Sequence, residues 1–357
     1  MSMSAERAMK LGKSSDEIVV GAAWPFADRN DGFKEGLELA LEEINQTGVI
    51  GSKIKLEQKD DLSSVTDGLT IAQNFSNDLN VTAVIGDRSS AVTVPASKVY
   101  EQAGVLFLAP TSTSPKLTEG GVSHIFRLIP NDTQIGAEMA DYANSKMYKN
   151  IAVFYANDEY GRGLANSFED SAKISDIQII DRVSDYKDID DLRRLVNKWN
   201  ALGCDAVFVA EAMPDGANII LELRKAGLNL PVMGGDALDS DSLIEIGEKA
   251  VEGVVVASIF NPNDTDPKVR DFVESYKSRF GAEPNKYAAQ AYDSLHLLAA
   301  AITEADSRKP ADIAAALRKQ ETWPGVSGDR SFDASGDVND MHIVMKQVKQ
   351  GQFEYLK

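Results

Sequence analysis

The chain alternates between short apolar segments and longer amphipathic segments with a helical period. Residues 18–23 form an apolar run, and residues 32–45 carry Phe33, Leu37 and Ile44 at helical spacing. Strands that alternate with helices over short connections are typical of βαβ units. The pattern therefore predicts a parallel sheet covered by helices on its faces.

The same pattern occurs twice along the chain, on either side of a polar break at Pro130-Asn131-Asp132. Before the break we predict strands at 18–23, 53–58, 81–85 and 105–108, and helices at 32–45, 65–77 and 91–102. After it we predict strands at 151–155, 177–183, 205–209, 231–233 and 253–257, and helices near 134–147, 161–173, 188–201, 214–226 and 240–247. Two similar α/β lobes follow from this repetition.

The last hundred residues depart from the strand and helix alternation. After a polar break at 261–264, the pattern predicts helices near 267–280, 286–305 and 310–319. Residues 325–340 are rich in Gly, Asp and Ser, and the segments 343–348 and 353–356 alternate like a hairpin that needs a sheet edge to join. We expect the chain to cross between the lobes three times, near residues 129, 260 and 330. The expected lobes are 18–129 with 260–330, and 130–259 with 331–357, preceded by a flexible N-terminal segment, 1–17.

Length and charge restrict the classes of partner. A chain of 357 residues exceeds what one hydrophobic core usually serves, and its net charge of -18 repels nucleic acid and anionic membrane surfaces. Apolar runs such as residues 254–259 fall far short of the ~20 residues of a membrane span, so we expect no membrane insertion. Residues 1–17 lack the apolar core of a secretion signal. We therefore expect a protein that is either cytosolic or exported with its signal removed.

Several candidate motifs for cofactors, metals and catalysis are incomplete. Residues 161–166 nearly fit a dinucleotide fingerprint, but Asn166 replaces the third glycine. The acidic run 185–191 lacks the glycine and the final glutamate of a calcium loop. The single cysteine, Cys204, allows no internal disulfide and has no neighbouring base. The three histidines lie far apart in the sequence, so we expect no cofactor and no metal.

Hydroxyl-bearing residues follow two successive strands of the first lobe. The loop Asp87-Arg88-Ser89-Ser90 opens a predicted helix, and Thr111-Ser112-Thr113-Ser114 follows the strand at 105–108. Carboxyl ends of parallel strands meet at one sheet edge, and a helix N-terminus there favours an anion. The pattern predicts a site that binds a carboxylate. Ser90 could instead be a plain helix N-cap, and Thr111 and Thr113 could be ordinary turn residues.

Several short motifs together resemble a known family, the branched-chain-amino-acid type of periplasmic binding protein. These proteins are the solute receptors of ABC importers and have the type I fold. The resemblance extends from Ile18 to Leu356. It rests on Val84-Ile85-Gly86 with Ser89-Ser90 and Pro95-Ala96-Ser97, on Gly104-Val105 with Pro110-Thr111-Ser112-Thr113 and Pro115, on Tyr160-Gly161 with Gly163, and on Phe332-Asp333 with Gly336-Asp337.

The resemblance implies the fold and the identity of the binding residues. It implies two lobes, each a three-layer α/β sandwich, joined by a three-segment hinge and closing over a ligand. In the family, a serine and a threonine hydroxyl bind the ligand carboxylate, and they match Ser90, next to Ser89, and Thr113. The residue matching Thr111 offers its backbone carbonyl to the ligand ammonium.

In the second lobe, the resemblance assigns two residues to the ligand. A family tyrosine matches Tyr160, and an acidic residue after the strand at 231–233 matches Asp236, which would pair with the ammonium. The alternative for Tyr160 is a surface position, and for Asp236 it is helix capping. Since Asp239 or Ser240 can cap the following helix, we expect Asp236 to face the ligand rather than to serve as the cap.

The sequence departs from well-known members of the family at two places. The loop Trp24 to Asp31 is short and aromatic, so Trp24 or Phe26 either shapes the side-chain pocket or packs beneath the lobe. Arg88 could add a charged partner for the carboxylate, but we expect a solvent-facing position because Ser90 lies deeper in the loop. In the second lobe Glu211 stands where the family often has an aromatic residue, which puts strict branched-chain specificity in doubt.

We therefore expect a monomeric, non-enzymatic receptor for a free amino acid that works with an ABC permease. Its expected location is periplasmic, or extracellular and membrane-associated. Three alternatives remain open at this point: a sensor or receptor for urea or an aliphatic amide, an aromatic-acid receptor of the same fold, and an α/β enzyme that uses Asp236 or Glu211 as a base.

Overall fold

The computed structural model describes residues 2–13, 15–27, 31–339 and 341–356, which form two compact units. Unit 1 comprises Met1–Pro130 and Phe260–Met341, and unit 2 comprises Asn131–Ile259 and His342–Lys357. The chain passes from one unit to the other after Pro130 and again after Ile259. The third crossing lies between Met341 and His342 rather than near residue 330.

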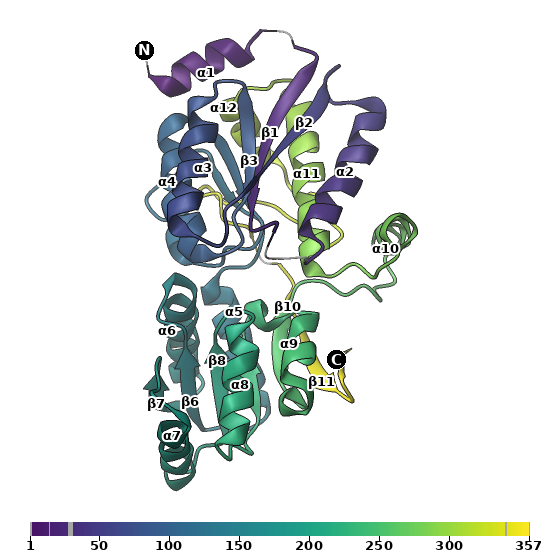
Figure 1. Ribbon diagram of the computed structural model, residues 1–357. Coiled ribbons are helices and arrows are strands. Elements are labelled where there is room, and N and C mark those ends of the chain that lie inside the picture. Colours follow the sequence, from purple (N-terminus) through teal and green to yellow (C-terminus); the bar gives the residue numbers. More distant parts are fainter. Residues whose placement is uncertain (1, 14, 28–30, 340, 357) are drawn as a thin grey trace. The chain divides into compact units, whose positions relative to one another are not determined.

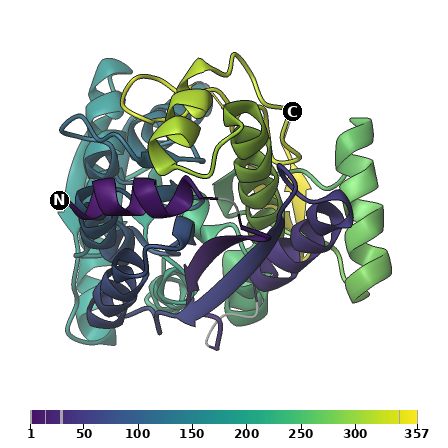
Figure 2. The same cartoon turned by 90° about the horizontal axis from the view of Figure 1, so that it is seen from above.

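Unit 1 is built on a parallel sheet of five strands in the order β2-β1-β3-β4-β5 (Figure 1). Its strands are β1 (Glu17–Trp24), β2 (Lys53–Asp60), β3 (Val81–Gly86), β4 (Leu106–Ala109) and β5 (Ile125–Arg127). Buried side chains join one face of this sheet to α2 (Phe33–Thr47), α11 (Lys286–Ala305) and α12 (Pro310–Lys319). On the other face they join it to α3 (Val65–Asn77) and α4 (Ser90–Ala103). The view in Figure 2 shows α2 and α11 side by side, and α10 (Pro267–Phe280) packs through Phe272 on this side.

Unit 2 repeats this architecture and adds a hairpin. Its sheet has the order β12-β11-β10-β9-β8-β6-β7. The parallel strands are β6 (Asn150–Tyr155), β7 (Gln178–Val183), β8 (Ala206–Ala210), β9 (Val232–Gly234) and β10 (Val255–Ser258). The hairpin of β11 (Val344–Lys349) and β12 (Gln352–Tyr355) joins β10 antiparallel, which confirms the expected sheet edge.

Helices cover both faces of the unit 2 sheet. The helices α5 (Asp132–Ser145) and α6 (Glu159–Ile174) share one core cluster with the sheet, and α7 (Ile189–Ala201), α8 (Asp215–Lys225) and α9 (Asp241–Gly247) share another. Short 3₁₀ turns occur at Pro115–Leu117, Asp236–Leu238 and Glu248–Val251. Each unit is thus a three-layer α/β sandwich, as predicted.

Both sheets reverse their strand order at an equivalent place. In unit 1 the reversal lies between β1 and β3, and in unit 2 it lies between β6 and β8. Ligands of open α/β sheets bind outside the carboxyl ends of the strands at such a switch point. The fold therefore predicts that ligand-binding residues follow β1 and β3 in unit 1, and β6 and β8 in unit 2.

The N-terminal segment is a packed helix rather than the expected flexible chain. Helix α1 (Met3–Leu11) begins at Ser2, whose hydroxyl accepts from the Ala5 amide, and it buries Arg7 completely. The Arg7 guanidinium donates to four backbone carbonyls, those of Ser76, Asp78, Val81 and Ala103, at 2.5 to 3.4 Å. Burial lowers the pKa of Arg7 to about 10. These bonds fix α1 to the ends of α3 and α4.

The segment after α12 belongs to unit 1 because buried polar contacts hold it there. Arg330 pairs with Asp293 of α11 at 2.8 Å, and both side chains are buried. Phe332 packs edge-on against Phe126 of β5, with 5.2 Å between the ring centroids. These partners lie far apart in the sequence, which is why composition placed the boundary too early.

Candidate functional site

Ser90 lies at the start of α4, at the carboxyl end of β3. It is the first helical residue, and Ser89 occupies the N-cap position without a side-chain capping bond. The simple N-cap interpretation of Ser90 is therefore wrong. Its buried hydroxyl accepts a hydrogen bond from the Ser112 hydroxyl at 3.1 Å. Amides in the first turn of a helix have no intrahelical acceptor, so this position suits an anion.

The loop after β4 brings Thr111 and Thr113 to the same edge. The Thr111 hydroxyl donates to the carbonyls of Asp87 and Arg88 at 3.2 and 2.9 Å, and so ties the two loops together. Thr113 is only 1% exposed, and its hydroxyl has no hydrogen-bond partner among the described residues. A buried hydroxyl without a partner is costly, and it is a natural donor to a bound ligand.

Trp24 packs in the core of unit 1, at the carboxyl end of β1. Its ring stacks on Phe33 with 3.6 Å between centroids, and its indole nitrogen donates to Asp31 at 3.3 Å. This arrangement favours packing beneath the lobe over direct ligand contact. Phe26 is half-buried against the same cluster, and residues 28–30 of this loop lie outside the described residues.

Arg88 is not solvent-facing, contrary to expectation. Its side chain is 12% exposed and forms an ion pair with Asp31 at 3.2 Å. It also donates to the Tyr287 hydroxyl at 3.0 Å. Burial raises the pKa of Asp31, and the Arg88 charge partly offsets that shift. These contacts could not be predicted from the sequence, because Tyr287 and Asp31 lie far from Arg88 along the chain.

In unit 2, the structure brings Tyr160 and Asp236 together. Tyr160 lies in the first turn of α6, which Asp158 caps through a bond from the Gly161 amide at 2.8 Å. The Tyr160 hydroxyl donates to Asp236 Oδ1 at 3.4 Å and accepts from the Ala237 amide at 3.3 Å. Both side chains are buried. The surface alternative for Tyr160 is therefore wrong.

Asp236 is not the cap of the next helix. Ser240 caps α9 by accepting from the Ser242 amide at 3.3 Å. Asp239 is buried, and its Oδ1 atom accepts a hydrogen bond from Lys346 Nζ at 2.8 Å. Its Oδ2 atom accepts a short hydrogen bond from the Ser258 hydroxyl. As predicted from the sequence, a neighbouring residue caps the helix, and the Asp236 carboxylate accepts from the Tyr160 hydroxyl.

Glu211 follows β8, the strand beside β6 in the sheet. Its side chain is half-buried, and one carboxylate oxygen accepts from the Ala212 amide at 3.3 Å. Burial, with a smaller contribution from the negative charges of Asp158 and Asp215, raises the pKa of Glu211 to about 7. A carboxyl that is partly protonated at neutral pH can both donate and accept hydrogen bonds.

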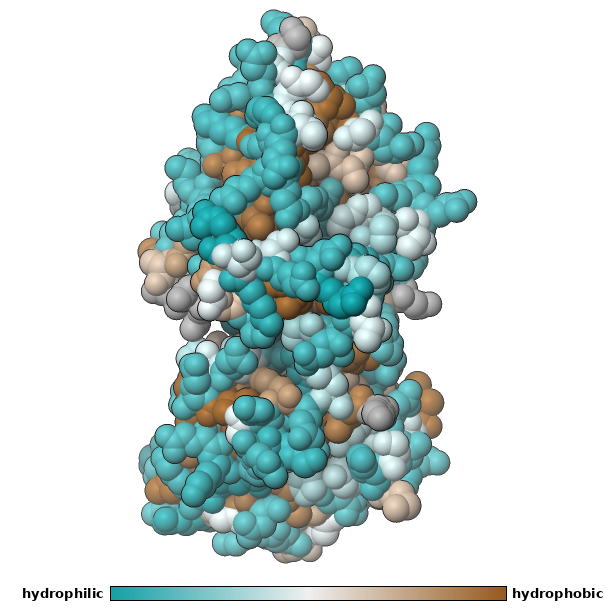
Figure 3. Space-filling model, turned by 90° about the vertical axis from the view of Figure 1, so that its right-hand side faces the viewer, coloured by the Kyte–Doolittle hydropathy of each residue, from teal (hydrophilic) through white to brown (hydrophobic). Residues whose placement is uncertain are grey.

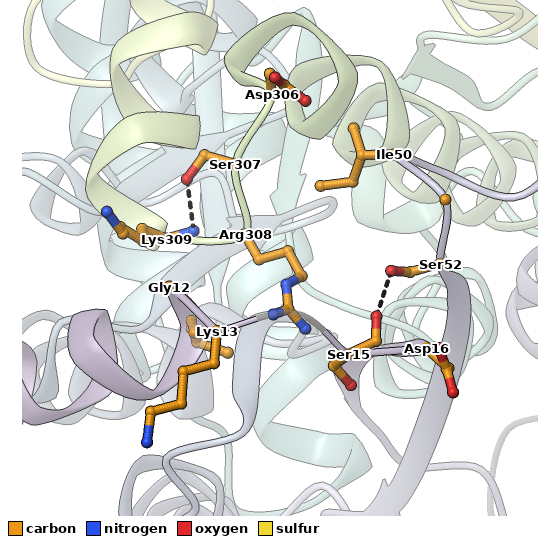
Figure 4. Close-up of a pocket in the computed structure, with 12 residues that line it drawn as sticks. Gly12, Lys13, Ser15, Asp16, Ile50, Ser52, Asp306, Ser307, Arg308 and Lys309 are labelled. Atoms are coloured by element: carbon orange, nitrogen blue, oxygen red, sulfur yellow. Dashed lines mark hydrogen bonds between the residues drawn. The ribbon is translucent and has the colours of Figure 1, made fainter.

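The cavity drawn in Figure 4 lies elsewhere in unit 1, at the amino ends of β1 and β2. It has a volume of about 680 Å³, and Lys13, Asp16, Ser52 and Arg308 are among the side chains that line it. None of the candidate residues lines this cavity. This cavity lies at the amino ends of the strands and carries charges of both signs. The candidate residues lie at the carboxyl ends of strands, where ligands of open α/β sheets bind.

The described residues contain no cluster of three or more His, Cys, Asp or Glu side chains that could hold a metal ion. Within the same residues, no helix is both long enough and apolar enough to cross a membrane.

Comparison with known proteins identifies the family. The family described as periplasmic binding protein matches residues 25–352 of this chain. The chain belongs to the periplasmic binding protein family. Members of this family are receptors that bind ligands rather than enzymes, so the interpretation of Asp236 or Glu211 as a catalytic base is wrong.

Relatives of this periplasmic binding protein cover nearly its whole length. An amino acid binding protein of Pseudomonas aeruginosa is 31% identical over 95% of this chain and 92% of its own. A Leu/Ile/Val-binding protein homologue of Brucella abortus is 30% identical, with the same coverage. The resemblance seen in the sequence is thereby confirmed.

Solved structures show the same fold. An ABC transporter substrate-binding protein from Desulfitobacterium hafniense, in complex with Leu, is 41% identical, with a TM-score of 0.88 over 95% of this chain and 100% of that one. A branched-chain amino acid transporter substrate-binding protein from Streptococcus pneumoniae, in complex with isoleucine, is 26% identical, with a TM-score of 0.85 over 95% of this chain and 98% of that one.

Proposed function

We propose that this periplasmic binding protein is a receptor for a free amino acid and delivers it to an ABC permease. The proposal rests on the chemistry of the candidate residues at the carboxyl ends of the strands in each unit. Unit 1 presents neutral hydroxyls at a helix N-terminus, including that of Thr113, which no described residue bonds. Unit 2 presents a buried carboxylate, Asp236. Hydroxyls and amides suit a ligand carboxylate, whereas a buried carboxylate suits an ammonium.

Each candidate residue has a proposed role in this receptor. Ser90 and Thr113 bind the ligand carboxylate, with Ser89 beside them, and the Thr111 carbonyl accepts from the ammonium. Asp236 pairs with the ammonium, and the Tyr160 hydroxyl orients Asp236. Trp24 supports the site from the core.

Glu211 is our candidate for contact with the ligand side chain. The complexes of the relatives with Leu and isoleucine favour an aliphatic amino acid. A pKa of about 7 leaves a substantial neutral fraction of Glu211, which lowers the desolvation cost of placing it beside an apolar group. The names of the relatives and the family also support a periplasmic location, and we propose that the protein acts as a monomer.

Titration calorimetry tests the proposal directly. L-leucine and L-isoleucine should bind, whereas acetamide, urea and benzoate should not. Asp236→Asn should weaken L-leucine binding but spare 4-methylpentanoate, which has the same carbon skeleton without the amine. Binding of acetamide or benzoate with no response to any amino acid would refute the amino-acid assignment and favour an amide or aromatic-acid receptor.

A further inference from the structure

Arg127, the last residue of β5, reaches the loop that carries Thr113. The side chain is completely buried, and its Nη1 atom donates to two backbone carbonyls. These are the carbonyls of Ser112 at 3.2 Å and Ser114 at 2.6 Å. They lie on either side of Thr113 in the chain, so one guanidinium nitrogen fixes the backbone before and after that residue.

The other nitrogens of Arg127 bond to Thr118 and Asp337. Asp337 lies in the segment of unit 1 that follows α12. Nε donates to Asp337 Oδ1 at 2.7 Å, and Nη2 donates to Asp337 Oδ2 at 3.2 Å and to the Thr118 hydroxyl at 2.8 Å. With the two carbonyl bonds, five hydrogen bonds occupy the five N–H groups of a guanidinium. A lysine at this position offers three donors from one atom and cannot reproduce the fork.

Asp337 is itself held in place against β5. The Thr118 hydroxyl donates to its Oδ2 at 3.2 Å, and its backbone amide donates to Asp333 at 2.9 Å. The preceding residue, Gly336, accepts from the Arg127 amide at 2.9 Å. Gly336 has φ +82, and a Cβ there would lie 2.1 Å from the Ile125 carbonyl oxygen, so this close approach requires glycine.

Thr113 contributes no side-chain bond of its own among the described residues, so its position depends on the backbone around it. We propose that Arg127, with Asp337 as its counter-ion, is the positioning residue that aims the Thr113 hydroxyl at the ligand carboxylate. If the protein binds an amino acid as proposed, the segment that carries Asp337 supports ligand binding without contacting the ligand. Arg127 is completely buried and Asp337 is partly buried, so loss of the Asp337 charge leaves the guanidinium uncompensated, and loss of the guanidinium fork frees the loop.

Two variants and a matched control test the proposal. Arg127→Lys and Asp337→Asn should each weaken L-leucine binding at least about tenfold by calorimetry. Arg318→Lys is the control, because Arg318 also donates to backbone carbonyls, those of Val122, Ser123 and Ala334, but does not reach Thr113. Arg318→Lys should keep its affinity within about twofold. Equal losses in Arg127→Lys and Arg318→Lys would overturn the assignment.

A double-mutant cycle separates positioning from general damage. If Arg127 acts through Thr113, Arg127→Lys should cost much less affinity in a Thr113→Val background than in the wild type, because the hydroxyl to be aimed is gone. Additive losses would refute the proposal. If Arg127→Lys does not fold, Asp337→Asn takes its place in the cycle.

Hydrogen exchange of the ligand-free protein gives a readout that needs no amino acid. Amides of residues 112–114 should exchange faster in Arg127→Lys than in Arg318→Lys. Unchanged exchange would overturn the positioning role whatever the ligand is. If instead the wild type binds no amino acid while this exchange difference is present, the proposed function fails and the role of Arg127 in ordering the loop stands.

Discussion

Among the residues that the structure describes, the buried hydroxyl of Thr113 has no hydrogen-bond partner, whereas those of Ser90 and Thr111 are already bonded. Thr113→Val removes the hydroxyl at nearly constant volume. We expect unchanged or slightly higher thermal stability without ligand, and an L-leucine affinity lower by about 1–3 kcal/mol. Melting curves and calorimetry measure the two effects separately.

Thr118→Val is the matched control for this substitution, because the Thr118 hydroxyl bonds both Arg127 and Asp337. It should lower the melting temperature of the ligand-free protein. An equal loss of stability in Thr113→Val would contradict the interpretation of its hydroxyl as a group reserved for a ligand.

The raised pKa of Glu211 predicts that the stability of the protein depends on pH. Its folded pKa, about 7, is raised above the usual carboxyl value because burial penalises the charged form. Such a group contributes stability below its unfolded pKa, and that contribution is lost as the pH rises through the folded pKa. Relative to Glu211→Gln, the wild type should therefore lose stability between about pH 5 and pH 8. Parallel melting temperatures of the two proteins over this range would argue against the raised pKa.

At the scale of elements, Arg7 holds α1 to the ends of α3 and α4 through four carbonyls. Arg7→Leu should cost about 2–4 kcal/mol of unfolding free energy, because buried carbonyls lose charge-assisted partners. Denaturant titration measures this loss, and faster amide exchange in α1 should accompany it. Lys10→Ala, at an exposed position of the same helix, should change little. Equal effects of the two variants would show that α1 is not anchored by Arg7.

Elements with a strong local pattern were predictable from sequence. The helices 267–280, 286–305 and 310–319 agree with the structure to the residue, because their apolar spacing and their caps are both local. The short strand β5 and helix α1 were missed. The first has three residues, and the second depends on the distant partners of Arg7.

The same distinction applies to the candidate site. Ser90 and Thr113 could be proposed from the sequence because each follows a strand whose carboxyl end is recognisable. The contacts of Arg127 and Arg88 could not be predicted, since their partners Asp337 and Tyr287 lie far away along the chain. Pairing of buried charges across long sequence separations leaves no periodic signal.

At the scale of the whole molecule, the net charge of -18 should influence stability. Hydrophilic residues cover much of the face in Figure 3, with apolar residues in separate patches. Excess negative charge destabilises a compact state by self-repulsion, and salt screens it within a Debye length of about 8 Å at 0.15 M. The melting temperature should therefore rise between low salt and 0.15 M NaCl. Sucrose at equal osmolality serves as the control, and a fall with salt would show that surface ion pairs outweigh the repulsion.

Neither unit is a continuous stretch of the polypeptide, and this affects the order in which the protein can fold during translation. The sheet of unit 2 gains β11 and β12 only from residues 344–355, and unit 1 gains α11 and α12 only after all of residues 131–259 have been made. Domains usually fold from the N-terminus as they leave the ribosome. In this chain the core of unit 1 is complete only once residue 341 has been made, and the sheet of unit 2 only once residue 355 has been made, so both cores are finished late in synthesis.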